Sequence, residues 1–262
     1  MGMADLTRTL LADITSLYSP AALLWLCIGS LLAGLVRGFT GFGTAMVFLP
    51  FAGRVTDPVQ AITIMMLMDL LGPMLLAPRT LKQTNRGELV KLTVGAVLAM
   101  PLGVLVLFLL PPDMFRYIVS AVTFVLLFCL IGGVRYRKPL APATVYGVGA
   151  AGGFFGGSVG LPGPPVIFLY FASTLPAAVI RANIFIYLLI ADLLILAAFG
   201  IQGRLLTEAV VVGLLMGFPC LLTMGLGSVL FNPAHERLYR GAAYFIIAAS
   251  AVIGLPVIGQ FL

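Results

Sequence analysis

Charged residues are scarce in this chain. Only 9% of its 262 residues are Asp, Glu, Lys or Arg, whereas 61% are hydrophobic. A soluble domain cannot bury that much apolar surface, so an integral membrane protein is expected, with the lipid bilayer as its surroundings. The net charge of +6 does not indicate nucleic-acid binding, because the basic residues fall in short loops and not on one clustered face.

Residues that bind metals or form disulfides are also few. The chain has a single histidine, His235. Its three cysteines, Cys27, Cys129 and Cys220, share no C-x-x-C spacing. No metal, cofactor or disulfide framework is therefore expected. The first 19 residues lack a basic n-region, which argues against a cleaved signal peptide.

Long apolar runs dominate what remains. Several of them approach the roughly 20 residues that a helix needs to cross the hydrocarbon core. They are continuous and do not alternate, which disfavours a transmembrane barrel and predicts an all-α polytopic membrane protein. We expect about ten segments, near residues 20–36, 39–53, 58–77, 89–110, 114–134, 144–157, 161–175, 178–200, 206–231 and 238–261.

Three loops, 78–88, 135–139 and 232–240, hold most of the Lys and Arg residues. An even number of segments separates each successive pair, so all three loops are expected on one face. The positive-inside rule makes that face cytoplasmic and places both termini on the extracytoplasmic side.

Two glycine-rich stretches indicate an internal repeat. A shift of 119 residues superposes Gly34, Gly38 and Gly41 of "AGLVRGFTGFGTAMVFLP" (33–50) on Gly153, Gly157 and Gly160 of the stretch "AGGFFGGSVGLPGPP" (151–165). The residues "DLL" recur at 69 and 192, a shift of 123, so the alignment needs gaps. With an odd number of crossings in each half, the repeat is expected to be inverted, as in many secondary transporters. If the two glycine-rich segments of each half formed one broken span instead, the repeat would be parallel; the loop charges favour inversion. The expected organisation is an N-terminal extracytoplasmic segment (1–19), a first repeat (20–134), a basic cytoplasmic linker (135–143) and a second repeat (144–262).

The glycine-rich segments are expected to be broken or re-entrant helices that form the substrate site. Irregular backbone is tolerated in a membrane only beside protein or a water-filled cavity, and a helix N-terminus there attracts anions. Close packing between helices is the alternative explanation for the glycines. The residues predicted to bind the anion from these segments are Gly41, Gly43, Thr44, Gly157, Ser158, Gly160 and Gly163.

Ionisable residues inside apolar runs are costly and are functional candidates. Asp69 and Asp192 are predicted to couple transport to protons, with structural hydrogen bonding as an equal alternative. Arg37, and Arg181 with Asn183, are predicted to bind the anion, because a guanidinium presents a fixed fork of donors to an oxyanion. A snorkelling arginine is the alternative, and it suits Arg37 better than Arg181.

Two further features bear on function. Arg54 and Asp57 are expected to form an exposed loop pair without a role. The residues "GGSVG" (156–160) match G-x-S-x-G, so an intramembrane serine hydrolase is a weaker alternative. It would need His235, which lies in a cytoplasmic loop, to reach Ser158 at membrane depth; the protein is therefore not expected to be an enzyme.

The two glycine-rich stretches, with "GPPVIFLYFASTLPAAVIRANIFIYLLIADL" (163–193), resemble the paired signatures of the sulfite exporter TauE/SafE family. The resemblance implies a multi-pass inner-membrane protein that moves sulfite, sulfonates or related organosulfur or carboxylate anions. It places Gly160, Pro164, Pro165 and Arg181 on motif positions. Gly41-Phe42-Gly43-Thr44 departs from the usual run of glycines.

The predicted function is thus a secondary transporter for a small anion that works by alternating access. The two glycine-rich loops are expected to meet at the midplane around the anion. An anion channel with the same constriction is the main alternative. A homodimer is compatible with this interpretation.

Overall fold

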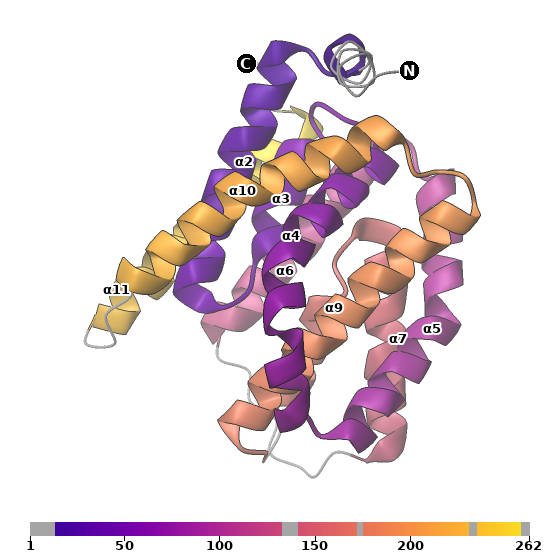
Figure 1. Cartoon of the computed structure of the whole chain (residues 1–262), viewed down its shortest axis with the longest axis vertical. Coiled ribbons are helices and arrows are strands. Elements are labelled where there is room, and N and C mark those ends of the chain that lie inside the picture. Colours follow the sequence, from indigo (N-terminus) through magenta and orange to yellow (C-terminus); the bar gives the residue numbers. More distant parts are fainter. Residues whose placement is uncertain (1–13, 133–140, 172–174, 231–234, 258–262) are drawn as a thin grey trace, which may run out of the picture. The chain divides into compact units, whose positions relative to one another are not determined.

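Every regular element in the described part of the chain is a helix. The computed structural model describes residues 14–132, 141–171, 175–230 and 235–257 (Figure 1). Residues 1–13 of the predicted N-terminal segment, 135–140 of the predicted linker and 232–234 of the last basic loop lie outside these ranges. The helices are α2 (Pro20–Thr40), α3 (Thr44–Ala52), α4 (Pro58–Thr80), η1 (Leu81–Gln83), α5 (Arg86–Leu109), α6 (Pro112–Gly132), α7 (Pro142–Val159), α8 (Gly163–Phe171), α9 (Ala177–Ile201), α10 (Thr207–Leu230) and α11 (Glu236–Gly254).

Five of these helices, α2, α5, α6, α9 and α10, are long and apolar enough to cross a membrane. A sixth span results if Pro58–Met74 and Ala77–Gln83, two segments bent by 63° relative to each other within α4 and η1, are counted as one. Each of the ten predicted segments corresponds to one of the helices α2–α11. The prediction of an all-α polytopic membrane protein is confirmed.

The first glycine-rich stretch is a helical hairpin, because α3 turns back along α2. Gly43, just before α3, lies beside Val36 of α2. Near the far end of α3, the Phe51 carbonyl accepts a hydrogen bond of 3.1 Å from the indole N–H of Trp25. The start of α3 therefore lies beside the end of α2, and the end of α3 lies beside the first half of α2. The two helices are antiparallel.

The second stretch also reverses direction. Gly160 ends α7 in the left-handed conformation (φ 71°), and the Leu161 N–H donates to the Phe155 carbonyl at 3.2 Å. Pro162 then packs against Gly152 and Gly156 of α7. Only residues 160–162 separate α7 from α8, so most of the predicted irregular segment is helical.

Two compact units form the chain. The first contains residues 1–69 and 205–262, and the second contains residues 70–204. Each predicted repeat therefore contributes helices to both units. The same kind of pairing recurs inside them: α2 of the first hairpin packs on α10, and α7 of the second packs on α5.

Glycines bring α5 and α7 into backbone contact. A Cβ atom on Gly149 would lie 2.2 Å from the Leu92 carbonyl oxygen, and one on Gly157 would lie 2.7 Å from the Met100 carbonyl oxygen. Such distances leave no room for a side chain, so Gly157 serves close helix packing in this structure. This was the alternative explanation for the predicted site glycines.

The pair α2–α10 is packed in the same way. A Cβ atom on Gly34 would lie 2.2 Å from the Cys220 carbonyl oxygen, and one on Gly38 would lie 2.6 Å from the Met224 carbonyl oxygen. The last turns of α2 are therefore held directly against the backbone of α10. That contact fixes the position of the hairpin tip described next.

Candidate functional site

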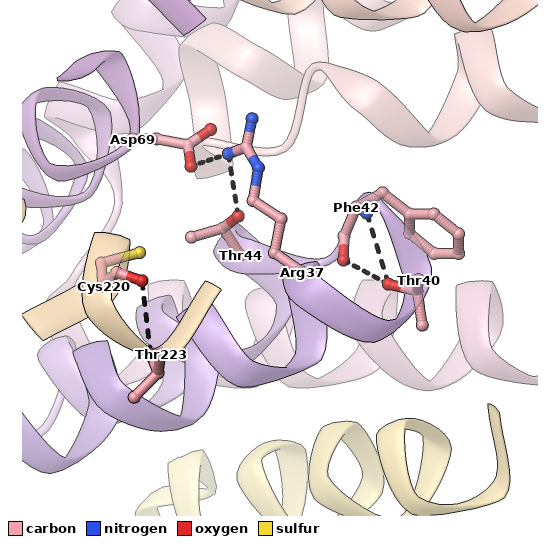
Figure 2. Close-up of polar contacts among 7 residues, drawn as sticks. All are labelled: Arg37, Thr40, Phe42, Thr44, Asp69, Cys220 and Thr223. Carbon is pink, nitrogen blue, oxygen red and sulfur yellow. Dashed lines mark hydrogen bonds and ion pairs between the residues drawn. The ribbon is translucent and has the colours of Figure 1, made fainter. Parts of the chain in front are cut away.

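A buried polar cluster lies where the first hairpin reverses direction (Figure 2). The Arg37 guanidinium, in the last turn of α2, forms an ion pair with Asp69 of α4. The same nitrogen, Nη1, donates to the Thr44 hydroxyl at 3.1 Å. The Arg37 and Asp69 side chains are each 11% exposed, and Thr44 is 4% exposed, so the cluster is nearly withdrawn from solvent.

Two glycines determine the backbone path between Arg37 and Thr44. Gly41 (φ 79°) caps α2 by donating its N–H to the Arg37 carbonyl at 2.7 Å. Gly43 (φ 98°) precedes α3. Both φ values lie in the left-handed region, which costs any residue with a Cβ roughly 1–2 kcal/mol. The sequence G-x-G is thus what allows Thr44 to start a new helix beside Arg37.

Thr40 supports this turn from within α2. Its hydroxyl oxygen lies 2.7 Å from the Phe42 carbonyl and 2.8 Å from the Val36 carbonyl, and the Phe42 N–H points to it at 3.3 Å (Figure 2). These local bonds satisfy backbone groups that the helix break exposes. The turn is therefore stabilised by contacts with its own side chain and backbone.

The N-terminus of α3 adds a partial positive charge beside Arg37. In the described part of the chain, no side chain caps this terminus and its first turn holds no acidic residue. A helix start of this kind presents backbone N–H donors to an anion. Thr44, the first residue of α3, accepts a hydrogen bond from Arg37, and this contact does not use its hydroxyl proton.

The cluster is chemically suited to a small oxyanion. Asp69 already shows that a carboxylate fits against the Arg37 guanidinium, which can hold two oxygens of one group in a fork. Asp69 is also the central residue of α4, with 11 helical residues on each side. Its carboxylate is therefore as far from the ends of this apolar helix as it can be.

Sequence reasoning identified Arg37, Asp69, Gly41, Gly43 and Thr44 one by one but missed that they meet. The alternative that Arg37 is a snorkelling arginine is disfavoured, because its side chain is only 11% exposed and is paired with Asp69. A signal was available, since two opposite charges in otherwise apolar runs are costly unless they meet.

The second hairpin presents its predicted residues differently. The Ser158 hydroxyl donates to the Phe154 carbonyl of its own helix at 2.7 Å, and Ser158 is 4% exposed. Gly160 supplies the left-handed turn, and Gly163 begins α8 beside Leu188. In this structure, the Ser158 hydroxyl proton is thus used in a hydrogen bond within α7 and is not directed to a general base.

Asn183 belongs to a buried polar network inside the second unit. Its amide oxygen accepts the Asn85 N–H at 2.8 Å, and its amide nitrogen donates to the Tyr170 hydroxyl at 2.8 Å. Tyr170 donates in turn to Glu88 at 3.1 Å. Both ends of the Asn183 amide are thus engaged in holding the start of α5.

We expect Asn183→Ala to lower the free energy of unfolding by about 1–3 kcal/mol, because it leaves the Asn85 N–H without its acceptor and removes the donor to the Tyr170 hydroxyl. Thermal melting of the purified protein would measure this. Tyr170→Phe in the same background should then cost less than it does alone, since the two residues share one network. Equal melting temperatures for Asn183→Ala and the unmodified protein would contradict the assignment.

Arg181 and Asp192 lie apart along α9. Arg181 is exposed on the first turn of the helix, and in the described residues it forms no hydrogen bond or ion pair. Asp192 is 5% exposed in the interior of the helix. The Arg37 side chain is thus largely buried, whereas Arg181 is exposed.

Arg54 and Asp57 do not form the exposed pair expected from the sequence. Asp57 caps α4 by accepting the N–H groups of Val59 and Gln60, each at 3.0 Å. Arg54 lies over the ring of Trp25 instead, 5.1 Å from its centroid. The expectation was wrong because a helix N-terminus competes successfully for a nearby carboxylate.

The comparisons agree with a transport protein. The family model described as "Sulfite exporter TauE/SafE" matches residues 26–253, which include both hairpins and the Arg37 cluster. No curated protein and no solved structure shows significant similarity to the chain. With its apolar helices and a match over most of its length, the chain is a multi-pass membrane protein that belongs to the sulfite exporter TauE/SafE family of transporters.

Proposed function

We propose that this protein is a secondary transporter for a small oxyanion, such as sulfite or an organosulfonate, in the bacterial inner membrane. The observation that carries the proposal is the buried Arg37–Asp69–Thr44 cluster at the tip of a glycine hairpin. The Arg37 guanidinium, the Thr44 hydroxyl and the N-terminus of α3 form the anion seat. The basic loops face the cytoplasm and both termini face outward.

Asp69 occupies the place that the anion takes during transport. When an anion binds Arg37, it displaces the Asp69 carboxylate, which then lacks a counter-charge in a buried position. Burial disfavours the charged form of an unpaired carboxylate, so Asp69 takes up a proton. Each anion is thereby accompanied by one proton, and the two leave together when the Arg37–Asp69 pair re-forms.

The second hairpin and α9 hold the remaining predicted site residues. In the proposal, Gly160 and Gly163 shape a second broken helix, with Gly157 and Ser158 at its side. Arg181 provides positive charge for the anion on its path, Asn183 lies close to it in sequence, and Asp192 is a second candidate for proton transfer. These assignments depend on the sequence pattern and the family resemblance.

Proteoliposomes that contain a pH-sensitive dye would test the proposal. An inward sulfite gradient should acidify the lumen beyond the effect of sulfite on protein-free liposomes, and Asp69→Asn should remove this excess. Asp57→Asn is the matched control, because Asp57 is an exposed cap that asparagine can replace. Asp192→Asn tests whether Asp192 also contributes to the proton movement that accompanies sulfite.

Other outcomes would lead to other conclusions. Voltage-driven, non-saturating anion current without proton movement would indicate a channel with the same dipole-lined constriction. Normal flux in Arg37→Gln but none in Arg181→Gln would move the anion seat to the start of α9. No flux of sulfite, sulfonates or carboxylates would contradict the transport function itself.

A further inference from the structure

A cleft with a volume of about 450 Å³ lies beside the first half of α2, away from the hairpin tip. All of its lining residues belong to the first compact unit. None of them takes part in the anion seat proposed above. The lining consists of Ser19, Ala21, Ala22, Trp25, Arg54 and Val55.

Trp25 is held rigidly in the wall of this cleft. Its indole N–H donates to the Phe51 carbonyl at 3.1 Å, and its ring lies 5.0 Å from the Phe51 ring between centroids. The Arg54 guanidinium lies over the Trp25 ring at 5.1 Å. A fixed aromatic face and a cation thus meet at one site.

One nitrogen of the Arg54 guanidinium lacks a hydrogen-bond acceptor in the described residues. This nitrogen, Nη1, is buried. The nearest acid in sequence, Asp57, caps α4, and it forms no ion pair with Arg54. A buried charged donor without an acceptor is costly, and such groups normally have a partner.

The other lining residues indicate what kind of group would accompany the anion in the cleft. Ala21, Ala22 and Val55 are apolar, and the Ser19 hydroxyl already accepts the Ala22 N–H at 3.1 Å. A mostly apolar cleft with one charged group at its edge is typical of a small-ligand site, and its volume falls in the range of such sites. An inorganic anion would satisfy Arg54 but leave the apolar wall unused.

We propose that this cleft binds an organic anion: an oxyanion head that pairs with Arg54 and an apolar body that packs against Trp25. Two sources share this chemistry, a soluble alkyl sulfonate or carboxylate and the headgroup region of an anionic lipid. The site is separate from the Arg37 seat, so it does not depend on the transport mechanism.

Trp25 is the only tryptophan in the chain, so its fluorescence reports on this site alone. Purified protein in a non-ionic detergent is titrated with 1-butanesulfonate in one arm and with dihexanoyl phosphatidylglycerol in the other. Sulfate lacks the apolar body, and 1-butanol lacks the charge. We expect a saturable change in emission with at least one of the two organic anions, and binding at least tenfold weaker for sulfate and for butanol.

Variants separate this site from the anion seat. Arg54→Gln should weaken binding at least tenfold, whereas Arg37→Gln should leave the Trp25 titration unchanged. Val55→Phe, which fills the cleft without touching a charge, should also block binding and serves if Arg54→Gln does not fold. Saturation by butanesulfonate alone identifies a soluble ligand, and saturation by the lipid alone identifies a lipid.

The proposal is overturned if neither organic anion changes Trp25 emission in a saturable way. It is also overturned if folded Arg54→Gln and Val55→Phe proteins bind as tightly as the unmodified chain. If the unmodified protein moved no sulfite but still gave a saturable Trp25 titration, the proposed transport function would be contradicted and the ligand site at Arg54 would be supported.

Discussion

Replacing Arg37 by glutamine is expected to abolish anion flux and to lower the free energy of unfolding by about 3–5 kcal/mol. The substitution leaves the Asp69 carboxylate buried without its counter-charge, which is the costly way to break a buried ion pair. It also removes the cation that binds the anion. Flux into proteoliposomes and thermal melting in detergent measure the two effects separately.

The double variant Arg37→Gln/Asp69→Asn separates structure from function. With both charges gone, no carboxylate is left unpaired, so most of the lost stability should return. Flux should stay absent, because no guanidinium remains at the anion seat. If flux returns together with stability, the Arg37–Asp69 pair is only a structural link and the anion binds elsewhere.

Gly149→Ala is expected to have the second largest effect, a loss of about 1–3 kcal/mol or more in the free energy of unfolding. The added Cβ would lie 2.2 Å from the Leu92 carbonyl oxygen. Since that oxygen belongs to the α5 backbone, no rotamer change relieves the clash and the helices must separate. Melting temperature and yield of folded protein in detergent are the measurements.

Gly147→Ala is the matched control on the same helix. Nothing lies within 4 Å of a Cβ atom at this exposed position. Alanine is the better helix former by nearly 1 kcal/mol, so this variant should be as stable as the unmodified protein or more so. If Gly149→Ala melted at the same temperature as Gly147→Ala, α5 and α7 would not pack as closely as described.

The helices could be predicted well because their signal is local. Apolar length, charged loops and clustered Gly and Pro residues mark the segments, and each of them corresponds to a helix in the structure. The roles of individual glycines in the second glycine-rich stretch could not be predicted from this local signal. Gly157 and Gly160 look alike in sequence, yet one packs against α5 and the other makes a left-handed turn, and only the neighbouring helix distinguishes them.

The candidate site was predictable as a set of residues but not as an arrangement. Arg37 and Asp69 are 32 residues apart, and their pairing depends on how α4 passes the hairpin. The role of Asn183 depends equally on distant partners, since Asn85 lies 98 residues before it. Arg54 was misjudged because the acid three residues later caps a helix and the aromatic partner, Trp25, comes from another one.

The position of Asp69 in the chain has a mechanical consequence. The first compact unit ends at Asp69 and the second begins at Leu70, in the middle of the continuous helix α4. In the described part of the chain, α4 is the only helix that belongs to both units. The Arg37–Asp69 ion pair therefore anchors the last residue of the first unit to α2 of the same unit, and α4 continues into the second unit from that anchored residue.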